Sequence, residues 1–195
     1  QQAWDAFEPI GFDTSSRQPI TPPDADVLAR RYVDQLRDYI DDAIAPQVAR
    51  VERMIRRRGP SVRDYNRLGV IYARYQMYDE AIEWFRKAVE LEPNAHSYLN
   101  LGNIDYLNES FTSALQQYQE AERLDPNDEK VLLAVARAHH EMENYGDAVP
   151  YFDQLKQINP ELAERFAYLE FRGSETGRAS DAALMSSVVV WGEEE

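Results

Sequence analysis

The sequence predicts an all-α protein, a small solenoid assembled from three copies of one helical unit. The main observation is a repeat, because residues of the same kind recur at intervals of 33 and 34 positions. Small residues recur in this way at Gly69, Gly102 and Ala136. Two further series keep the same intervals, namely Ala81, Ala114 and Ala148, and Pro93, Pro126 and Pro160. A period of this length is typical of repeat architectures such as solenoids.

Aromatic and aliphatic residues complete the pattern around these positions. The first copy reads Tyr65, Leu68, Gly69, Tyr72, Ala81, Phe85, Ala88 and Pro93. The second copy reads Tyr98, Leu101, Gly102, Ala114, Tyr118, Ala121 and Pro126, with Asp105 where the first copy has its second ring. The third copy is looser and reads Leu132, Val135, Ala136, His139, Ala148, Phe152, Leu155 and Pro160.

This pattern resembles the tetratricopeptide repeat family, whose repeat is a helix-turn-helix unit. The resemblance covers residues 62 to about 161 and implies a right-handed α-solenoid of three such units with flanking capping helices. The small residues would let the two helices of each unit approach closely, while the rings fill the wider gaps. Proline has no N–H and restricts the residue before it, so the proline series fits the break between units.

Segments of different character flank the repeats. We expect an extended or disordered leader over residues 1–23, a helical hairpin over 24–59, repeats over 62–94, 95–128 and 129–161, a C-terminal capping helix over 162–172, and a flexible acidic tail over 173–195. The leader is rich in proline and shows little periodicity, which is typical of a segment that packs no core.

The expected hairpin over 24–59 begins at Asp24, which suits a helix cap. Apolar residues then recur at spacings of three or four, which predicts an amphipathic helix; they are Leu28, Tyr32, Leu36, Tyr39, Ile40 and Ile44. We expect Pro46 to interrupt this helix and a second helix to run from Val48 to Gly59. The pair is interpreted as an N-terminal cap or a degenerate repeat.

The tail combines an apolar stretch, Val188 to Trp191, with the acidic end Glu193 to Glu195. One interpretation is a disordered, solvated tail. The other is a short linear motif that binds elsewhere, because Trp191 is unusual in a purely solvating segment. The tail could also occupy the groove of a neighbouring copy and build oligomers.

Composition narrows the possible partners and compartments. The net charge of −14 and the isoelectric point near 4.6 disfavour nonspecific binding to nucleic acid and to anionic membranes. No apolar run reaches the ~20 residues that span a bilayer, so we expect a soluble protein without a transmembrane segment. Cysteine is absent, which leaves the redox compartment open. Because the sequence begins at Gln1, it is interpreted as a fragment or as a mature form, either cytoplasmic or exported after removal of a leader.

In the family, the first helices of the repeats line a concave groove that contacts extended peptides. Carried over to this chain, the resemblance implies a peptide-binding groove formed by Arg63, Asn66, Arg67, Arg74, His96, Asn100, Asn103, Tyr106, Lys130, Arg137 and His140. This set is basic and rich in amides, so the expected ligand is an acidic or C-terminal peptide. The alternative is that these charges are merely solvated. Of the clamp with which some family members bind the acidic C-terminus of heat-shock chaperones, only Asn100 and Lys130 match, which disfavours that ligand.

Other kinds of site find little support. Arg50, Arg53 and Arg57 share a helix face and could bind phosphate, but pairing with acidic neighbours is favoured. The adjacent His139 and His140 point about 100° apart on a helix and cannot converge on a metal. No phosphate loop, activated serine or cysteine nucleophile occurs. We therefore expect no catalytic residue, no metal and no cofactor.

The favoured function is a non-catalytic adaptor or assembly scaffold that binds a protein or peptide partner in the groove. The alternative is a self-associating structural solenoid that builds a homo-oligomer through its tails or repeat edges. A more remote alternative is an enzyme or a metal-binding protein. Family membership constrains shape more than biology, so the identity of the partner stays open at this point.

Overall fold

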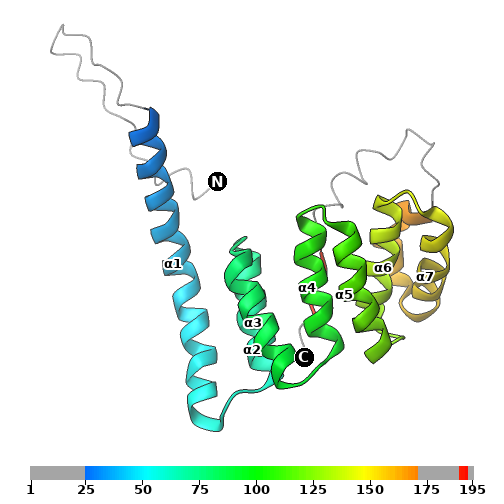
Figure 1. Ribbon diagram of the computed structural model, residues 1–195, viewed down its shortest axis with the longest axis horizontal. Helices are drawn as coiled ribbons and strands as arrows, with labels where there is room; N and C mark the ends of the chain where they lie inside the picture. Colours follow the sequence, from blue (N-terminus) through cyan, green and yellow to red (C-terminus); the bar gives the residue numbers. More distant parts are fainter. Residues whose placement is uncertain (1–24, 171–188, 193–195) are drawn as a thin grey trace, which may run out of the picture. The chain divides into compact units, whose positions relative to one another are not determined.

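The computed structural model describes residues 25–170 and 189–192, and these contain helices but no strand. The elements are α1 (Ala25–Arg58), α2 (Val62–Arg74), α3 (Tyr78–Leu91), α4 (Ala95–Leu107), α5 (Phe111–Leu124), α6 (Glu129–Glu141), α7 (Tyr145–Ile158), α8 (Pro160–Arg165) and a 3-10 helix, η1 (Ala167–Glu170). Figure 1 shows them coloured along the chain. The leader expected over residues 1–23 lies outside the described residues, as does most of the tail.

The chain divides into two compact units, residues 1–40 and 41–195. In the first unit, the described residues form the N-terminal half of α1. Several of its large apolar side chains are exposed, including Val27, Tyr32, Val33 and Tyr39. In the second unit, the remainder of α1 buries Ile44 and Val51.

The hairpin expected over residues 24–59 is wrong, because α1 is a single helix that continues through Pro46. A proline inside a helix removes one backbone hydrogen bond. A full break would leave about four N–H groups and four carbonyls without intrahelical partners. Beside the proline, the Gln47 side chain donates an additional hydrogen bond to the carbonyl oxygen of Ala43 at 3.1 Å. The helix then ends before Gly59, whose φ of 83° suits glycine.

The three repeats form helix pairs in the second unit, as the predicted fold class requires. Helix α2 packs on α3, α4 on α5, and α6 on α7, and each pair contacts the next (Figure 1). The first helices α2, α4 and α6 also contact one another in that order. The all-α solenoid of three helix pairs is therefore confirmed.

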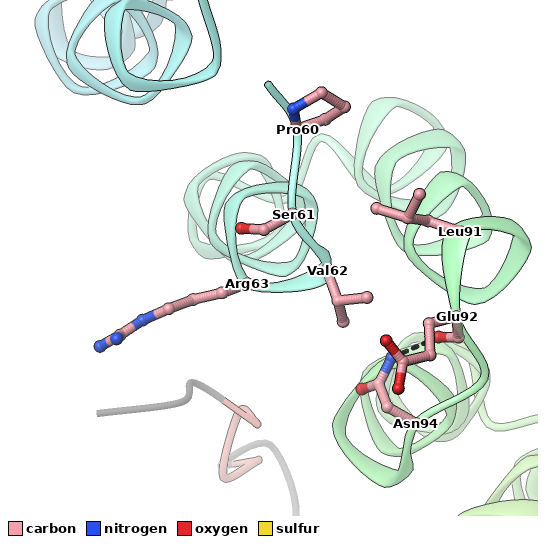
Figure 2. A pocket seen from close by; sticks show the side chains of 7 residues that line it. All are labelled: Pro60, Ser61, Val62, Arg63, Leu91, Glu92 and Asn94. Carbon is pink, nitrogen blue, oxygen red and sulfur yellow. Dashed lines mark hydrogen bonds between the residues drawn. The ribbon is translucent and has the colours of Figure 1, made fainter. Parts of the chain in front are cut away.

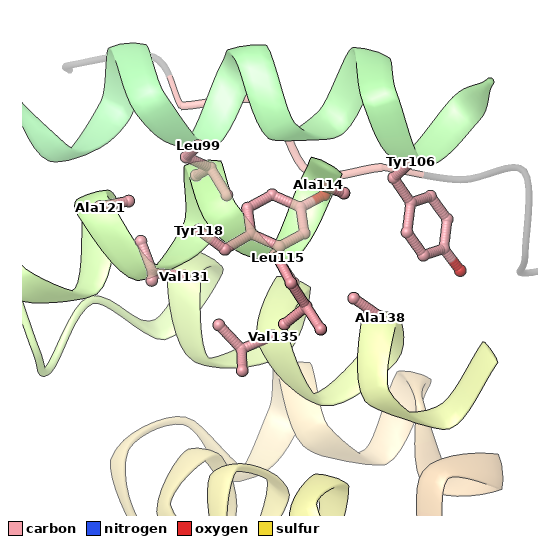
Figure 3. Close-up of a cluster of buried hydrophobic side chains, with 10 residues drawn as sticks. Leu99, Tyr106, Ala114, Leu115, Tyr118, Ala121, Val131, Val135 and Ala138 are labelled. Carbon is pink, nitrogen blue, oxygen red and sulfur yellow. The ribbon is translucent and has the colours of Figure 1, made fainter. Parts of the chain in front are cut away.

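Small residues and rings meet inside the first two pairs. A Cβ added to Gly69 would collide with the ring of Phe85, and one added to Gly102 would collide with the ring of Tyr118. The larger clusters of the core lie between successive helices. The one in Figure 3 joins α4, α5 and α6 and contains Leu99, Tyr106, Ala114, Leu115, Tyr118, Ala121, Val131, Ala134, Val135 and Ala138. The repeated small residues thus allow the close helix approach that the sequence predicts.

The turn inside each pair has one geometry in all three repeats. Gln76, Glu109 and Glu143 have positive φ values of 61°, 59° and 59°. One residue later, a backbone N–H reaches the carbonyl five positions back, as in the bonds from Met77 to Tyr72 and from Ser110 to Asp105. This is a Schellman motif, which satisfies carbonyls at a helix C-terminus.

The C-terminal side of the third repeat is covered by α8 and η1. Leu162, Phe166 and Leu169 are buried there against residues of α6 and α7. A single helix was expected over 162–172, whereas the structure has two short helical segments separated at Phe166. These segments cover apolar surface of the last repeat, as the end of a solenoid requires.

Candidate functional site

The first helices of the repeats, α2, α4 and α6, form a shared surface that we name the first-helix face. It corresponds to the groove implied by the family resemblance. Residues 189–192, red in Figure 1, contact this face through hydrogen bonds and apolar packing. The chain therefore places a short stretch of its own C-terminal region on the surface that was expected to bind a peptide.

Two asparagines of α4 bind the backbone of this segment. The Nδ2 of Asn100 donates to the carbonyl oxygen of Gly192 at 3.0 Å, and its Oδ1 accepts from the Gly192 N–H at 2.7 Å. The Nδ2 of Asn103 donates to the carbonyl oxygen of Val190 at 3.0 Å. Its Oδ1 accepts from the hydroxyl of Tyr118 at 3.0 Å, which fixes the orientation of the amide. These contacts involve backbone atoms, so they suit extended chains of varied sequence.

The side chains of the segment pack on apolar clusters of all three repeats. Trp191 stacks on Phe85, with ring centroids 6.3 Å apart and ring planes inclined by 21°. It joins a cluster built by α2, α3 and α4. Val189 packs against the cluster of α4, α5 and α6, and Val190 against that of α6, α7, α8 and η1. The segment therefore runs across the face from the third repeat toward the first.

Gly192 is buried against the first turn of α4. A Cβ added there would lie 2.8 Å from the Cβ of His96 and 3.0 Å from its Cα. The Nε2 of His96 lies 3.1 Å from Oδ2 of Asp128. Asp128 also caps α6, where its Oδ1 accepts from the N–H groups of Lys130 and Val131.

The charge of Asp128 is stabilised by these contacts. Burial by itself raises the pKa of the carboxyl, but hydrogen bonds from the His96 ring and from the two backbone N–H groups outweigh it. The pKa of Asp128 therefore lies below its ordinary value. The carboxylate links the start of α4 to the start of α6.

Arg137, expected as a cation of the groove, is only 3% exposed. Its guanidinium donates to the hydroxyls of Tyr106 and Tyr168, both at 3.3 Å, and lies over the rings of Tyr106 and Phe166. The hydroxyl of Tyr106 in turn donates to Glu141 at 3.1 Å. Burial raises the pKa of Tyr106 well above its ordinary value. Arg137 and Tyr106 thus join the second repeat, the third repeat and η1 within the protein.

Asn66, expected to contact a peptide, is instead bonded to the next repeat. Its Oδ1 accepts from the hydroxyl of Ser97 at 2.9 Å, and its Nδ2 donates to Oδ1 of Asn94 at 3.4 Å. Asn66 is buried. Its amide therefore connects α2 with the start of α4.

The remaining expected cations lie at several positions on the repeats. Arg63, Arg67 and Arg74 are exposed on α2, while Lys130 and His140 are half-buried on α6. His140 contacts the rings of Tyr145 and Tyr168 edge-on. Near the end of α1, next to the arginines that were considered for phosphate binding, Arg56 pairs with Glu52 at 3.3 Å and Arg58 with Asp64 at 2.8 Å.

An open hollow of about 470 Å³ lies where the start of α2 meets the end of α3 and the start of α4. Figure 2 shows that the Arg63 side chain extends away from it. Pro60, Val62 and Leu91 form much of its lining. Glu92 and Asn94 complete the side near α4, where the Asn94 amide donates to the Glu92 carbonyl at 3.0 Å.

Within residues 25–170 and 189–192, no three His, Cys, Asp or Glu side chains gather as metal ligands would. None of the helices described there combines the length and apolarity needed to cross a bilayer. The chemistry that the first-helix face does offer is backbone recognition by two oriented amides beside apolar surface.

The sequence did not reveal two parts of this arrangement. Phe85 was expected only as a core ring, yet it also carries Trp191. The sequence suggested that the tail binds elsewhere or in the groove of a neighbouring copy, but not that residues 189–192 bind the face of their own chain. Nothing in the repeat period relates the tail to Asn100, which lies 92 positions earlier.

Comparisons with known proteins agree with this fold. Two family models described as tetratricopeptide repeat match residues 62–95 and 95–163. A search of curated proteins finds no match. A crystal structure of MamA protein has a TM-score of 0.51 and 18% identity, and the match covers 70% of this chain and 79% of that chain. A second MamA crystal structure has a TM-score of 0.50 and 18% identity, with coverage of 72% and 82%. At this identity the likeness is one of fold.

Proposed function

The chain belongs to the tetratricopeptide repeat family, and we propose that it binds an extended, acidic segment of a partner protein on the first-helix face. The family fold is typically a non-catalytic protein-interaction module, which supports an adaptor or scaffold.

The observation that carries the proposal is the pairing of Asn100 with Gly192. Both polar atoms of one buried amide bind both backbone groups of one residue. Asn103 adds a third backbone contact two residues earlier in the segment, at Val190. A surface that binds the backbone of a segment of its own chain in this way has the donors and acceptors to bind the backbone of another protein.

The exposed arginines of α2 support a ligand whose apolar residues are followed by acidic ones. The bound segment runs toward the first repeat, where α2 presents exposed Arg63 and Arg67. In the sequence, Gly192 is followed directly by Glu193, Glu194 and Glu195. A partner segment that places carboxylates after its apolar residues would bring them toward these arginines in a protein that is otherwise strongly acidic.

The test uses a labelled peptide with the sequence of residues 186–195 and the full chain carrying Trp191→Ala, which weakens its own occupancy of the face. We expect fluorescence anisotropy to show binding that Asn100→Ala weakens by about tenfold or more, since one such step corresponds to 1.4 kcal/mol. A peptide with its glutamates replaced by glutamine should bind less tightly and lose its salt dependence. Binding that is indifferent to Asn100 would refute the proposal.

Self-association is the second candidate, and one observation favours it. A segment that fits the first-helix face of its own chain has the sequence needed to fit the same face of another copy. Sedimentation of the full chain at increasing concentration tests this. A mass that grows in the unaltered chain and stays monomeric in Trp191→Ala supports exchange of tails, whereas one monomeric mass for both excludes it.

A further inference from the structure

We infer that the first-helix face selects partner segments by a tryptophan-glycine pair preceded by two apolar residues, the pattern that residues 189–192 themselves carry. This inference rests on the proposed function and adds the sequence that the partner must present. Two features of the face argue for it, namely a position that admits only glycine and a ring that stacks on tryptophan.

The glycine requirement comes from the first turn of α4. A Cβ on residue 192 would lie 2.8 Å from Cβ, 3.0 Å from Cα and 3.1 Å from Cγ of His96. The Cα is helix backbone and the Cβ is attached to it, so neither atom can move aside as the end of a flexible chain could. The His96 ring is also bonded to Asp128 at 3.1 Å.

The segment cannot shift outward to make room for a side chain without losing its anchor. Gly192 contacts His96 and the Asn100 amide, which lie one helical turn apart on α4. The bonds to that amide are 2.7 Å and 3.0 Å long. A displacement large enough to relieve the contact with His96 would lengthen both bonds, so any residue larger than glycine is disfavoured.

The tryptophan requirement comes from Phe85. This ring is completely buried, and Gly69 lies so close to it that no Cβ would fit there. Trp191 stacks on it in a nearly parallel arrangement, with a centroid distance of 6.3 Å. Val70, Ala73 and other residues of the same cluster surround the contact. A large flat side chain fills this position, whereas a small one would leave apolar surface uncovered.

The two residues before the tryptophan are specified less strictly. Val189 and Val190 pack on apolar clusters of the second and third repeats. Both side chains stay half-buried, and the fixed contact at this point is from Asn103 to the backbone carbonyl of Val190. Other aliphatic residues of similar size would satisfy the same contacts.

A partner segment with this pattern must compete with residues 189–192 of the chain itself. Residues 189–192 are covalently attached to the face that they occupy, which gives them a high local concentration. An external segment therefore binds the unaltered chain more weakly than a chain whose own segment has been impaired. For this reason the test uses the full chain with Trp191→Ala.

The experiment compares labelled peptides of the sequence 186–195 on this Trp191→Ala chain. We expect replacement of the peptide tryptophan by alanine, and separately of its glycine by alanine, to weaken binding by about tenfold or more each. Replacement of the first valine of the motif, at position 189, by leucine should change affinity by less than about threefold. The unaltered peptide should also bind the unaltered chain more weakly than the Trp191→Ala chain.

A pair of variants at His96 isolates the steric cause. His96→Gly removes the Cβ and Cγ that a peptide side chain would meet and leaves only the Cα at 3.0 Å, so it should restore at least part of the binding of the glycine-to-alanine peptide. His96→Ala removes the ring and its bond to Asp128 but keeps the Cβ, so it should not restore binding. Recovery in both variants, or in neither, overturns the steric explanation.

The outcomes also separate this inference from the proposed function. If the unaltered peptide binds and depends on Asn100, but the tryptophan and glycine replacements bind within about twofold of it, the face binds extended chains without selecting this pair. The inference then fails while the proposed function stands. If no peptide binds, or binding does not depend on Asn100, the proposed function fails and the inference with it.

Discussion

Binding of residues 189–192 to the first-helix face depends strongly on one side chain, the amide of Asn100. It is completely buried, and both polar atoms have their partners in Gly192. A buried polar group left without a partner costs about 1 to 3 kcal/mol. The bonds also fix the orientation of the amide, because the backbone N–H must face Oδ1 and the carbonyl must face Nδ2.

Asn100→Asp should therefore release residues 189–192. A carboxylate has nearly the same shape and can still accept from the Gly192 N–H, but it presents a second acceptor to the Gly192 carbonyl, where Nδ2 now donates. We expect amide hydrogen exchange at Gly192 to accelerate by about tenfold or more. Mass spectrometry of the C-terminal proteolytic peptide measures this.

Asn108→Asp is the matched control, because Asn108 is exposed at the end of the same helix. The same chemical change there should leave exchange at Gly192 unaltered. Equal acceleration by both substitutions would show that added negative charge, and not the lost donor, releases the segment.

Asp128 gives a prediction about pH. Its pKa is lower in the folded protein than its ordinary value of 3.8, so its charged form stabilises the fold. This contribution is complete above about pH 4 and is lost as the pH falls through the lower folded pKa. Asp128→Asn keeps the acceptor that caps α6 but removes the charge.

Urea unfolding of both proteins at about pH 5 and about pH 3 tests this prediction. The unaltered chain should be more stable than Asp128→Asn at the higher pH, and the difference should shrink at the lower one. Taking the difference removes the titration of carboxyl groups common to both chains. A difference that stays constant or grows as the pH falls would contradict a lowered pKa at Asp128.

Sequence reasoning identified some residues of the site better than others. Asn100 and Asn103, two of the expected groove residues, contact residues 189–192. Asn66 was expected on the same grounds, but its amide oxygen accepts a hydrogen bond from the hydroxyl of Ser97 in the next repeat. Arg137 was expected to be a cation of the groove from its position on α6 alone. Its hydroxyl partners, Tyr106 and Tyr168, belong to α4 and η1, so the sequence of α6 did not reveal them.

At the scale of elements, each turn inside a repeat contains one residue with a strained backbone conformation, which the repeat period in the sequence did not predict. Gln76, Glu109 and Glu143 adopt the left-handed conformation without being glycine. For L-residues this conformation costs about 1 kcal/mol or more, while glycine is the usual residue at this place in a Schellman motif. The motif recurs although its side chains differ, because the backbone bonds it makes are the same in each repeat.

Glu109→Gly should therefore stabilise the protein by about 0.5 to 1 kcal/mol, as relief of strain exceeds the entropy that glycine adds to the unfolded chain. The midpoint of urea unfolding measures the change. Gln119→Gly is the control, because Gln119 is exposed in the interior of α5. There glycine should cost about 1 kcal/mol. A loss of stability in both variants would contradict strain at residue 109.

Helix α1 shows why element boundaries were harder to predict than the repeats. A proline inside a helix removes one hydrogen bond and its ring clashes with a carbonyl of the preceding turn, which together cost about 3 kcal/mol. Breaking the helix instead would create two new helix ends with unpaired backbone groups. At Pro46 the helix continues, and the buried Ile44 and Val51 on either side pack in the second unit.

At the scale of the whole molecule, the repeats were predictable because each contacts mainly its neighbours. Helix pairs at a fixed period need only local sequence to specify them, and Gly69 and Gly102 with their facing rings carry that information. The docked segment is different. Its hydrogen bonds join residues 87 to 92 positions apart, outside any period. The sequence therefore indicated the face, a candidate motif and, as one option, binding of that motif to a neighbouring copy, but not the contact within one chain.

Residues 189–192 touch apolar clusters from all three repeats, so their release should weaken the solenoid as a whole. Trp191→Ala should lower the free energy of unfolding by about 1 to 2 kcal/mol, less than for a fully buried tryptophan because Trp191 is only half-buried. Trp191→Phe keeps a ring over Phe85 and should lose less. Urea unfolding of the three proteins measures the series.

The same measurement distinguishes binding within one chain from exchange between copies. Contacts within a chain give a midpoint that does not depend on protein concentration, whereas contacts between copies raise the midpoint as concentration rises. Because the structure joins Trp191 to Phe85 of its own chain, we expect one midpoint for the unaltered protein over about a hundredfold range of concentration. A midpoint that climbs in the unaltered chain but not in Trp191→Ala would mean that the segment binds a neighbouring copy, and the first-helix face would then serve assembly.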